Sequence, residues 1–369
     1  MFDPHLMSGQ RILVTGGGTG LGQAMAEQFL RLGADVAICG RRKQVCDETA
    51  AAWRKQFPER RIDTFGVDIR IADAVEEMVD ALWQSGGLTG LVNNAAGNFV
   101  APTESLSSRA FDAVANIVFH GTFYVTQAVG KRWVQQAKAG EWTAEKKPYR
   151  SVMSIIVTWV ENGSPYVVPS AMSKAGIEVM TKSLAIEWAR FGIRLNAVGP
   201  GEIPTEGMSK RLNPGEEPGA RSRERNPMAR PGRMSELQNL ATFLMAPGQC
   251  DWLTGQSIFM DGGHALATGG NFYEMRIYTY APGDLPAVLE AWGKAVPIRE
   301  KLSPLAACWT SELGGLNKFV HVWPYKNSDE RTRIREESRK GGQWPPQSGV
   351  RPVRQENKML IPAAFSPLR

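Results

Sequence analysis

A glycine-rich run between an apolar stretch and a helix-like stretch is the part of this chain best suited to chemistry. Residues 15–22 read TGGGTGLG, directly after the apolar residues 12–14 and one residue before AMAEQFLRLG. A strand, a glycine turn and a helix in this order place backbone N–H groups where the helix dipole favours an anion. A Cβ atom on these glycines would hold the backbone away from a pyrophosphate or distort the turn. We therefore predict a nucleotide-cofactor site that includes Gly16, Thr19, Gly20, Leu21 and Gly22.

Residues at the ends of later apolar runs extend this predicted site. The second run ends at Arg41 and Arg42, where an NAD-binding protein would carry an acid for the ribose hydroxyls. Arginines instead suit the 2′-phosphate of NADP, although they could also merely cap a surface turn. Asp68 ends the third run and is placed to accept a hydrogen bond from the adenine amine. The other expected cofactor contacts are Asn94, Ala95, Gly97, Lys174, Pro200, Gly201, Ile203 and Thr205.

Composition limits the possible functions. A formal charge of +6 over 369 residues is modest, so a nucleic-acid role is not expected, and the basic cluster 221–225 is interpreted as solvated surface rather than a phosphate or CoA contact. The four cysteines show no C-x-x-C pairing, which favours a reducing compartment, and the four histidines lack ligand spacing, which argues against a metal. The N-terminus lacks a signal-peptide pattern, and no apolar run approaches 18 residues. We therefore expect a cytoplasmic protein without a membrane span.

The segments that must position these residues alternate between strand-like and helix-like patterns up to about residue 265. Helix-period segments such as 172–189 and 235–245 lie between most of seven short apolar runs. This alternation predicts an α/β fold, a Rossmann-type doubly wound parallel sheet with crossover helices. The polar segment 137–150 looks like a surface insertion before the fifth strand. The expected strands are Arg11–Val14, Val36–Cys39, Ile62–Val67, Gly90–Asn93, Ser151–Val157, Arg194–Val198 and Ser257–Met260.

A second, smaller domain is expected after residue 271. Residues 266–271 have linker composition, which sets the predicted domains at 1–265 and 272–369. The order of patterns in the second domain is βαββαβ, which indicates a ferredoxin-like α+β fold. The segments in this order are Tyr273–Tyr280, Leu285–Leu302, Leu305–Glu312, Lys318–Pro324, Ser328–Lys340 and a last apolar segment near Met359–Phe365.

Together, the motifs of residues 9–265 resemble the short-chain dehydrogenase/reductase family. TGGGTGLG, VDIR, NNAAGN, SKAG and GQSIFMDGG carry this resemblance. The strings NNAAGNFVAPTESLS, IVFHGT, VVPSAMSKAG and PGEIPTEGMSKRLNP make the chain most similar to the 2,4-dienoyl-CoA reductases of that family. The resemblance implies NADP as cofactor, with Lys174 on the nicotinamide ribose, and a homo-oligomer such as a dimer or tetramer.

The chain departs from the family at two catalytic positions. Ser170 stands where the family has a Tyr four residues before the Lys, and Val157 stands where it has a Ser thirteen residues before that Tyr. Ketone reduction needs a proton for the new alkoxide, and the Lys lowers the pKa of the phenol for this purpose. The pKa of a serine hydroxyl is far too high to replace it. Ordinary 3-ketoacyl reduction is therefore disfavoured.

The dienoyl-CoA reductases work without that Tyr, because their hydride goes to carbon and the site needs only donors to the thioester oxygen. The resemblance places Trp159 and His120 where the mitochondrial-type pattern has a Tyr and an Asn, and both can donate a hydrogen bond. We hypothesise that they form a modified oxyanion site, with Ser170 or Tyr166 near the proton route. The alternative is that Trp159 and His120 only line an apolar pocket.

Residues 272–369 resemble the NIPSNAP family through YEMRIYTYAPGDLPAVLEAW and LAACWTSELGGLNKFVHVWPY. This resemblance implies a dimeric α/β barrel that pairs two chains, and no catalytic residue is assigned to this domain. The leading function is then an NADPH-dependent oxidoreductase that reduces an unsaturated acyl thioester, with an acyl-CoA-like small molecule as substrate. Two alternatives remain, namely a dehydrogenase acting on another enoyl or carbonyl substrate, and a catalytically weak NADP-binding scaffold or sensor.

Overall fold

The computed structural model describes residues 2–98, 100–140, 149–205, 226–267, 272–311, 316–325, 328–340 and 344–360. Its contacts divide the chain into two compact units, Met1–Ala265 and Leu266–Arg369. The basic cluster 221–225 and the central part of the polar insertion, residues 141–148, lie outside the described residues. Among the described residues, no helix combines the length and the apolar character that crossing a membrane requires.

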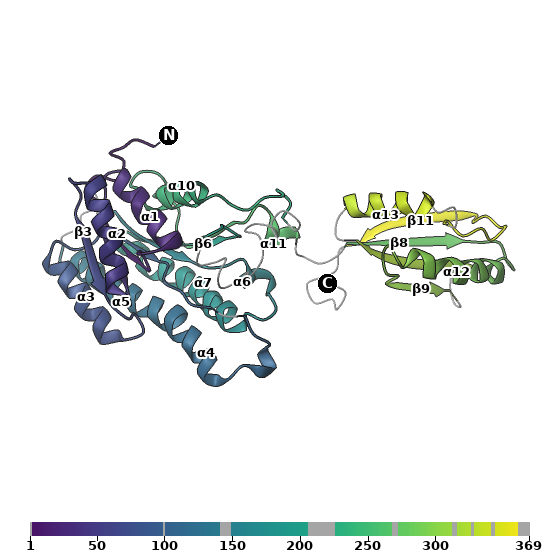
Figure 1. The fold of residues 1–369 in the computed structure, drawn as a ribbon, viewed down its shortest axis with the longest axis horizontal. Helices are drawn as coiled ribbons and strands as arrows, with labels where there is room; N and C mark the ends of the chain where they lie inside the picture. Colours follow the sequence, from purple (N-terminus) through teal and green to yellow (C-terminus); the bar gives the residue numbers. More distant parts are fainter. Residues whose placement is uncertain are drawn as a thin grey trace. The chain divides into compact units, whose positions relative to one another are not determined.

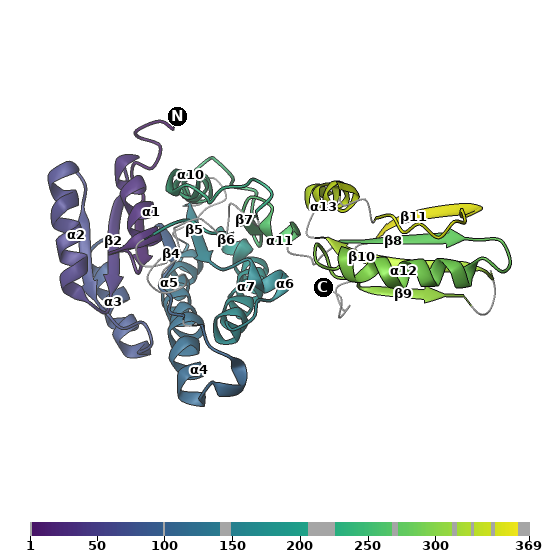
Figure 2. The ribbon, with the colours of Figure 1, turned by 45° about the vertical axis from the view of Figure 1, so that its right-hand side comes forward.

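The N-terminal unit is built on a parallel seven-stranded sheet with the strand order β3-β2-β1-β4-β5-β6-β7 (Figures 1 and 2). Most of these strands are rich in buried Val, Ile and Leu, as expected where helices cover both faces of a sheet. The doubly wound fold predicted from the alternating runs is confirmed. The strands are β1 Arg11–Thr15, β2 Asp35–Gly40, β3 Ile62–Gly66, β4 Gly90–Asn93, β5 Arg150–Ile155, β6 Ile193–Pro200 and β7 Ser257–Met260.

Two hydrophobic cores lie on opposite faces of this sheet. One core is formed with α1 Gly20–Arg31, α2 Lys43–Gln56 and α10 Met234–Met245. The other is formed with α3 Ala72–Gln84, α5 Gly121–Lys138 and α7 Val168–Trp188. The shorter helices of the unit are η1 Thr103–Ser105, α4 Ser108–Ala115, η2 Asn116–His120, α6 Trp159–Asn162 and η3 Ala189–Phe191. The short helix α11 His264–Ala267 contains the division between the two units.

The chain changes direction along the sheet between β1 and β4. From β1 it runs outward through β2 to β3, and it then returns to the other side of β1 as β4. β1 and β4 are neighbouring strands, and the connections that follow them lead to opposite sides of the sheet, toward β2 and toward β5. In open α/β sheets, a ligand crevice forms at this point, outside the carboxyl ends of the strands.

The C-terminal unit is a four-stranded antiparallel sheet with the order β11-β8-β10-β9. Its elements along the chain follow the predicted order βαββαβ, and its core is an aromatic cluster that includes Trp292, Phe319 and Trp323. The ferredoxin-like prediction is thus confirmed. The elements are β8 Phe272–Thr279, α12 Leu285–Arg299, β9 Ala307–Thr310, β10 Lys318–Tyr325, α13 Ser328–Lys340 and β11 Arg354–Leu360.

The predicted position of the last strand was wrong. The apolar pattern placed it near Met359–Phe365, whereas β11 begins at Arg354 and pairs with β8 alone. Its sequence RQENKML is charged and mostly exposed, as is common for an edge strand, so a search for apolar runs passes over it. Residues 361–365 lie outside the described residues, as do residues 268–271 of the predicted linker.

Candidate active site

The glycine turn after β1 is fixed by contacts with the loop after β4. Gly16 and Gly20 have φ angles of +65° and +60°, which glycine adopts without strain. The side-chain amide of Asn94 donates to the carbonyl oxygens of Thr15 and Gly16, at 3.0 and 3.3 Å. A Cβ on Gly22 would lie 2.5 Å from the Gly16 carbonyl oxygen, so only glycine fits there. The turn therefore holds its shape before any ligand arrives.

The N-terminus of α1 is open to an anion. Thr19 is the N-cap residue, but its side chain makes no capping hydrogen bond, and the first turn of α1 holds no acidic residue. The first N–H groups of a helix have no partner within the helix and carry a partial positive charge. A cradle of this kind fits the pyrophosphate of a dinucleotide.

A cavity of about 510 Å³ lies beside this turn, at the carboxyl ends of β1 to β4. We call it the cofactor cavity. It lies at the switch point between β1 and β4, where the fold predicts a ligand crevice. Seven of the predicted cofactor residues line it together, namely Gly16, Thr19, Arg41, Arg42, Asp68, Asn94 and Ala95.

Charged side chains sit at the adenosine end of the cofactor cavity. Arg41 and Arg42 follow β2 directly and both line the cavity. The carboxylate of Asp68 accepts from the guanidinium of Arg70 at 2.5 to 3.0 Å, and this hydrogen bond lowers the pKa of Asp68. Asp68 is therefore held ionised, so both of its carboxylate oxygens act only as hydrogen-bond acceptors.

The remaining cofactor residues lie at other places around the sheet edge. Gly20, Leu21 and Gly22 form the first turn of α1. A Cβ on Gly97 would lie 3.4 Å from Ile117, a lining residue of the cofactor cavity. Pro200, Gly201, Ile203 and Thr205 follow the carboxyl end of β6, where the Gly201 N–H donates to the Met260 carbonyl at 2.9 Å.

Lys174 and Ser170 lie one turn apart on α7, and both are buried. The ammonium group of Lys174 donates to the backbone carbonyl of Ile155, at the end of β5. Burial lowers the pKa of Lys174 to about 8. This group therefore sits at the sheet edge, and a backbone carbonyl is its hydrogen-bond partner among the described residues.

Three other proposed catalytic residues lie on the segments around α7 and α5. Trp159 begins α6, shortly after β5. Tyr166 precedes α7 with a φ of +66°, its carbonyl accepts from the Ala101 N–H at 3.0 Å, and its side chain is 54% exposed. His120 is exposed at the end of the π-helical turn η2, with its Nδ1 2.9 Å from Oδ1 of Asn116. Such π-helical turns occur often at functional sites.

Several lining residues of the cofactor cavity were missed in the sequence. Cys39 is the residue before the last one of β2, Cys46 lies on α2, and Ile117 lies in η2. Burial raises the pKa of Cys39 to about 12 and also raises that of Cys46, so both remain thiols and act as small apolar residues. The end position of Cys39 on a predicted strand could have indicated it, whereas no sequence signal indicates Ile117.

The cradle, the cavity and the buried lysine together define an oxidoreductase of the dinucleotide-dependent α/β class. Residues 16–265 match the family model described as enoyl-(acyl carrier protein) reductase, and residues 273–367 match the NIPSNAP model. The chain belongs to the short-chain dehydrogenase/reductase family and is an NAD(P)-dependent oxidoreductase with a NIPSNAP domain at its C-terminal end.

Two named relatives and one solved structure are similar to this chain over 70% to 74% of its length. A Caenorhabditis elegans protein named probable 2,4-dienoyl-CoA reductase 3 is 41% identical over 278 residues, 74% of this chain and 86% of the relative. A Bacillus subtilis protein named probable 2,4-dienoyl-CoA reductase is 34% identical over 262 residues, 70% of this chain and 98% of the relative. The crystal structure of a gluconate 5-dehydrogenase from Burkholderia cenocepacia, in complex with NADP and tartrate, is similar with a TM-score of 0.62 and 26% identity. It covers 71% of this chain and 98% of that structure.

Proposed function

We propose that this protein reduces 2,4-dienoyl-CoA thioesters with NADPH. The observation that carries the proposal is the buried serine, Ser170, one turn before the buried Lys174. A serine there offers no phenol to protonate an alkoxide, so hydride transfer to carbon fits this site better than ketone reduction. The names of the relatives from Caenorhabditis elegans and Bacillus subtilis support the same substrate class.

The preference for NADPH over NADH rests on the adenosine end of the cofactor cavity. Arg41 and Arg42 line the cavity where the 2′-substituent of the ribose is expected. A guanidinium group binds a phosphate through two parallel hydrogen bonds, and it gains much less from a neutral hydroxyl. The NADP named with the similar gluconate 5-dehydrogenase supports this choice.

Each proposed catalytic residue has a separate task. When bound, NADPH supplies the hydride. Lys174 would donate to the nicotinamide ribose and orient the ring. Trp159 and His120 would donate to the thioester oxygen while it carries the charge of the dienolate, and Ser170 or Tyr166 would hold the proton that the product gains.

The first test is the oxidation of NADPH, followed at 340 nm, with 2,4-hexadienoyl-CoA as substrate. Crotonyl-CoA and acetoacetyl-CoA serve as the enoyl and ketone controls, and fluorescence titrations measure the affinities for NADPH and NADH. We expect turnover with the dienoyl substrate alone. Turnover of acetoacetyl-CoA instead would show a carbonyl reductase, and tight NADPH binding without any turnover would show the scaffold or sensor.

A second test addresses the role of His120. With the His120 proton on Nδ1 facing Oδ1 of Asn116, a neutral ring presents Nε2 only as an acceptor, so a donor to the thioester requires the imidazolium or a reversed Asn116 amide. We expect His120→Ala to lower kcat/KM by on the order of 10²-fold, and His120→Asn, a neutral donor, to restore most of it. His5→Ala is the matched control, because His5 lies near the N-terminus, outside the cofactor cavity. Unchanged activity in His120→Ala would remove His120 from the oxyanion site.

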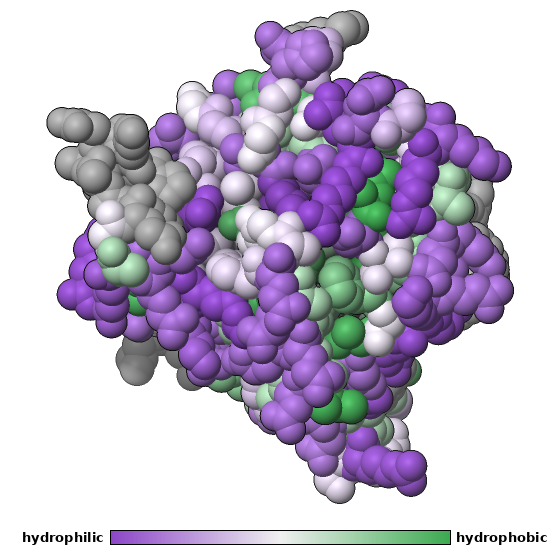
Figure 3. All heavy atoms as spheres, turned by 90° about the vertical axis from the view of Figure 1, so that its left-hand side faces the viewer, coloured by the Kyte–Doolittle hydropathy of each residue, from purple (hydrophilic) through white to green (hydrophobic). Residues whose placement is uncertain are grey.

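We also propose that the chain forms a homo-oligomer through α7. Met172, Val179 and Ile186 are 58%, 62% and 84% exposed and are spaced by seven residues, so they share one helix face. By contrast, the end of the N-terminal unit that carries β3 and α3 presents mainly hydrophilic side chains with small separate apolar spots (Figure 3). A second copy of the chain would cover the apolar face of α7. Light scattering should show a smaller assembly for Ile186→Lys than for Glu187→Lys, and equal masses would exclude this face.

The domain plan and the location complete the proposal. Residues 1–265 would act as the catalytic domain and residues 272–369 as an oligomerising domain without catalytic residues, joined by 266–271. A truncated chain ending at residue 265 should then keep dienoyl-CoA reduction and lose part of its assembly. A cytoplasmic location is checked by fractionating cells that express the tagged chain.

A further inference from the structure

The two long helices of the C-terminal unit pack on the same face of its sheet. Strand register places Trp323 of β10 opposite Glu274 of β8, and the alternation of side chains puts His321 on the same face. From α13, Arg331 donates to Glu274 at 2.6 Å. From α12, the Trp292 ring lies 4.4 Å from the His321 ring, measured between centroids. Side chains of both helices therefore meet those of β8 and β10 on this face.

Three guanidinium groups on this face meet at one carboxylate oxygen. Oε1 of Glu274 accepts from Arg276, Arg331 and Arg335, at 3.2, 2.6 and 2.9 Å. We call these three arginines the arginine cluster. Glu274 is the acidic group that pairs with them in the described part of the chain, so two positive charges are left over. The arginine side chains are 24% to 25% exposed, so an anion from the solvent can reach the cluster.

A fourth arginine, Arg299 on α12, lies beside the arginine cluster. It is 3% exposed, its guanidinium lies 4.5 Å from the Trp323 ring, and its Nη2 donates to the Tyr325 hydroxyl at 3.1 Å. Burial raises the pKa of Tyr325, whereas the charges of Arg299 and of the two α13 arginines lower it, so these three cations lie near one hydroxyl. Burial lowers the pKa of Arg299, whose described hydrogen-bond partner is neutral.

The buried side-chain atoms that lack hydrogen-bond partners in the described part of this unit are all donors. They are Nη1 of Arg299, Nε of Arg331 and Nε2 of His321. Burial lowers the pKa of His321 to about 3, and its Nδ1 accepts from Nε1 of Trp323 at 2.8 Å, so the proton of the neutral ring is on Nε2. Buried donors are normally bound by an acceptor. Water could accept from them, but it would leave the surplus charge in place.

We propose that the arginine cluster and Arg299 bind a small oxyanion of the phosphate class between α12 and α13. Its oxygens would accept from Nε of Arg331, from Nη1 of Arg299 and from N–H groups of Arg335 that do not bond Glu274. A phosphate monoester carries about −1.5 to −2 charges at neutral pH, close to the charge that the cluster leaves over. One guanidinium neutralises a carboxylate, so a purely structural cluster would not need three.

The test follows amide hydrogen exchange in the full chain with inorganic phosphate. Sodium chloride at matched ionic strength measures general salt effects, and glycerol 3-phosphate distinguishes a phosphate monoester from free phosphate. We expect saturable protection of β8 and β10, so that phosphate at ten times its Kd slows exchange through unfolding of this unit about 11-fold. The amides of β1 and β4 report separately on phosphate bound in the cofactor cavity. Equal protection of β8 and β10 by phosphate and chloride would overturn the proposal.

Variants on α13 locate the bound anion. Arg335→Gln leaves Glu274 with its two other arginines and should raise the phosphate Kd about tenfold or more, because charge-assisted hydrogen bonds are lost. Arg335→Lys keeps the charge beside Glu274 and should lose less affinity, since an ammonium lacks the planar fork. Arg333→Gln is the matched control, because Arg333 lies on the same helix, is 59% exposed and pairs with Glu337. A parent-like Kd in Arg335→Gln, or an equal rise in Arg333→Gln, would exclude this site.

Discussion

A buried lysine in the N-terminal unit and a buried glutamate in the C-terminal unit lie in very different surroundings. In the N-terminal unit, the Lys174 ammonium donates to the single backbone carbonyl of Ile155. In the C-terminal unit, Oε1 of Glu274 accepts from Arg276, Arg331 and Arg335 at 3.2, 2.6 and 2.9 Å, and also from Asn357 at 2.9 Å. Lys174 is 4% exposed and Glu274 is 1% exposed, so burial itself does not distinguish them.

The pKa values of the two groups record this difference. Burial lowers the pKa of Lys174 to about 8, and no charged group within the described part of the chain offsets this loss of water. Burial also raises the pKa of Glu274, but the hydrogen bond from Arg331 and the charge of Arg276 outweigh it and hold the value at about 2. The charge of Glu274 has its partners within the fold and therefore stabilises it. A charge that the fold leaves uncompensated marks a place where a ligand completes the set of partners.

The largest effect is expected from removing the compensated charge. Glu274→Gln leaves three arginines around a neutral side chain, which should cost the C-terminal unit about 3–5 kcal/mol of its free energy of unfolding. The N-terminal unit should keep its cofactor affinity. Hydrogen exchange of the amides in β8 and β10, compared with those in β1 and β4, measures the two units separately.

The matched control for this variant is Glu290→Gln on α12. Glu290 pairs with Lys294 at 2.6 Å, but the side chains are 70% and 75% exposed, so the change should leave the free energy of unfolding nearly unchanged. The pH dependence gives a further check. Glu274 has a folded pKa of about 2 against an ordinary value of 4.5, so its contribution is complete above pH 4.5 and disappears as the pH falls toward 2. Equal losses in the two variants would show that the arginine cluster does not stabilise the unit.

The charge of Lys174 should make stability rise with pH as well, but in an alkaline range, because there the loss of a destabilising charge, and not the gain of a stabilising one, is the cause. Between pH 8 and 10.5, Lys174 is neutral in the folded chain and protonated in the unfolded chain, so stability rises with pH. The rise reaches about 3 kcal/mol, at 1.36 kcal/mol per pKa unit. Lys174→Met should lack this rise, and below pH 8 it should be at least as stable as the parent while losing cofactor affinity.

Urea unfolding of the cofactor-free proteins, followed by circular dichroism from pH 7 to 10.5, measures this difference. The other titrating groups are the same in both proteins and cancel in the comparison. Lys182→Met is the control, because Lys182 lies on the same helix but is 53% exposed and paired with Glu178. Parallel curves for the parent and Lys174→Met would mean that the amine of Lys174 is charged and solvated in the folded state.

The same contrast explains how much of the protein its sequence could predict. All seven strands of the parallel sheet were found, because strands buried on both faces read as apolar runs. The glycine turn, Arg41 and Asp68 were found because each stands at a fixed offset from the end of such a strand. These features are local, and sequence patterns describe local features well.

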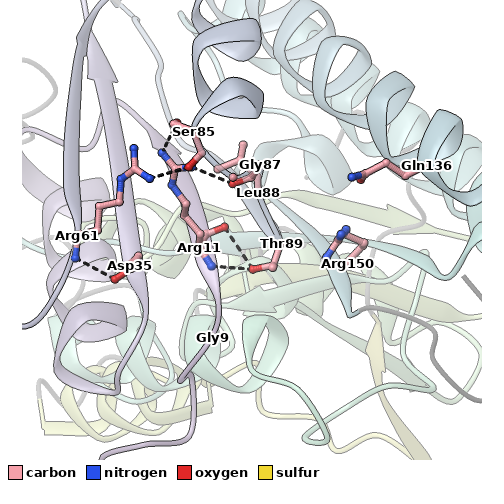
Figure 4. A pocket seen from close by; sticks show the side chains of 11 residues that line it. Gly9, Arg11, Asp35, Arg61, Ser85, Gly87, Leu88, Thr89, Gln136 and Arg150 are labelled. Atoms are coloured by element: carbon pink, nitrogen blue, oxygen red, sulfur yellow. Dashed lines mark hydrogen bonds between the residues drawn. The ribbon is translucent and has the colours of Figure 1, made fainter. Parts of the chain in front are cut away.

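The features that sequence could not predict depend on contacts between distant segments. The partners of Glu274 lie up to 83 residues further along the chain, so no pattern around Glu274 announces them. A second cavity, of about 270 Å³, brings together the beginnings of β1, β2 and β5 (Figure 4), and the Arg11 that lines it reads as an ordinary strand residue in the sequence. Ile117 lines the cofactor cavity from η2, a π-helical turn that the 3.6-residue pattern does not indicate.

The smallest effect is expected at the cofactor cavity, where surface arginines meet a ligand rather than the fold. Arg41→Ser/Arg42→Ser should leave stability within about 0.5 kcal/mol, since both side chains are exposed after β2. The preference for NADPH over NADH should fall by about 10- to 100-fold, because the charge-assisted hydrogen bonds to the 2′-phosphate are lost. Fluorescence titrations with both cofactors measure this ratio, with Arg60→Ser as the control, since Arg60 bonds the Gly33 carbonyl outside the cavity. A fall in affinity for both cofactors alike would place the arginines on the shared part of the dinucleotide instead.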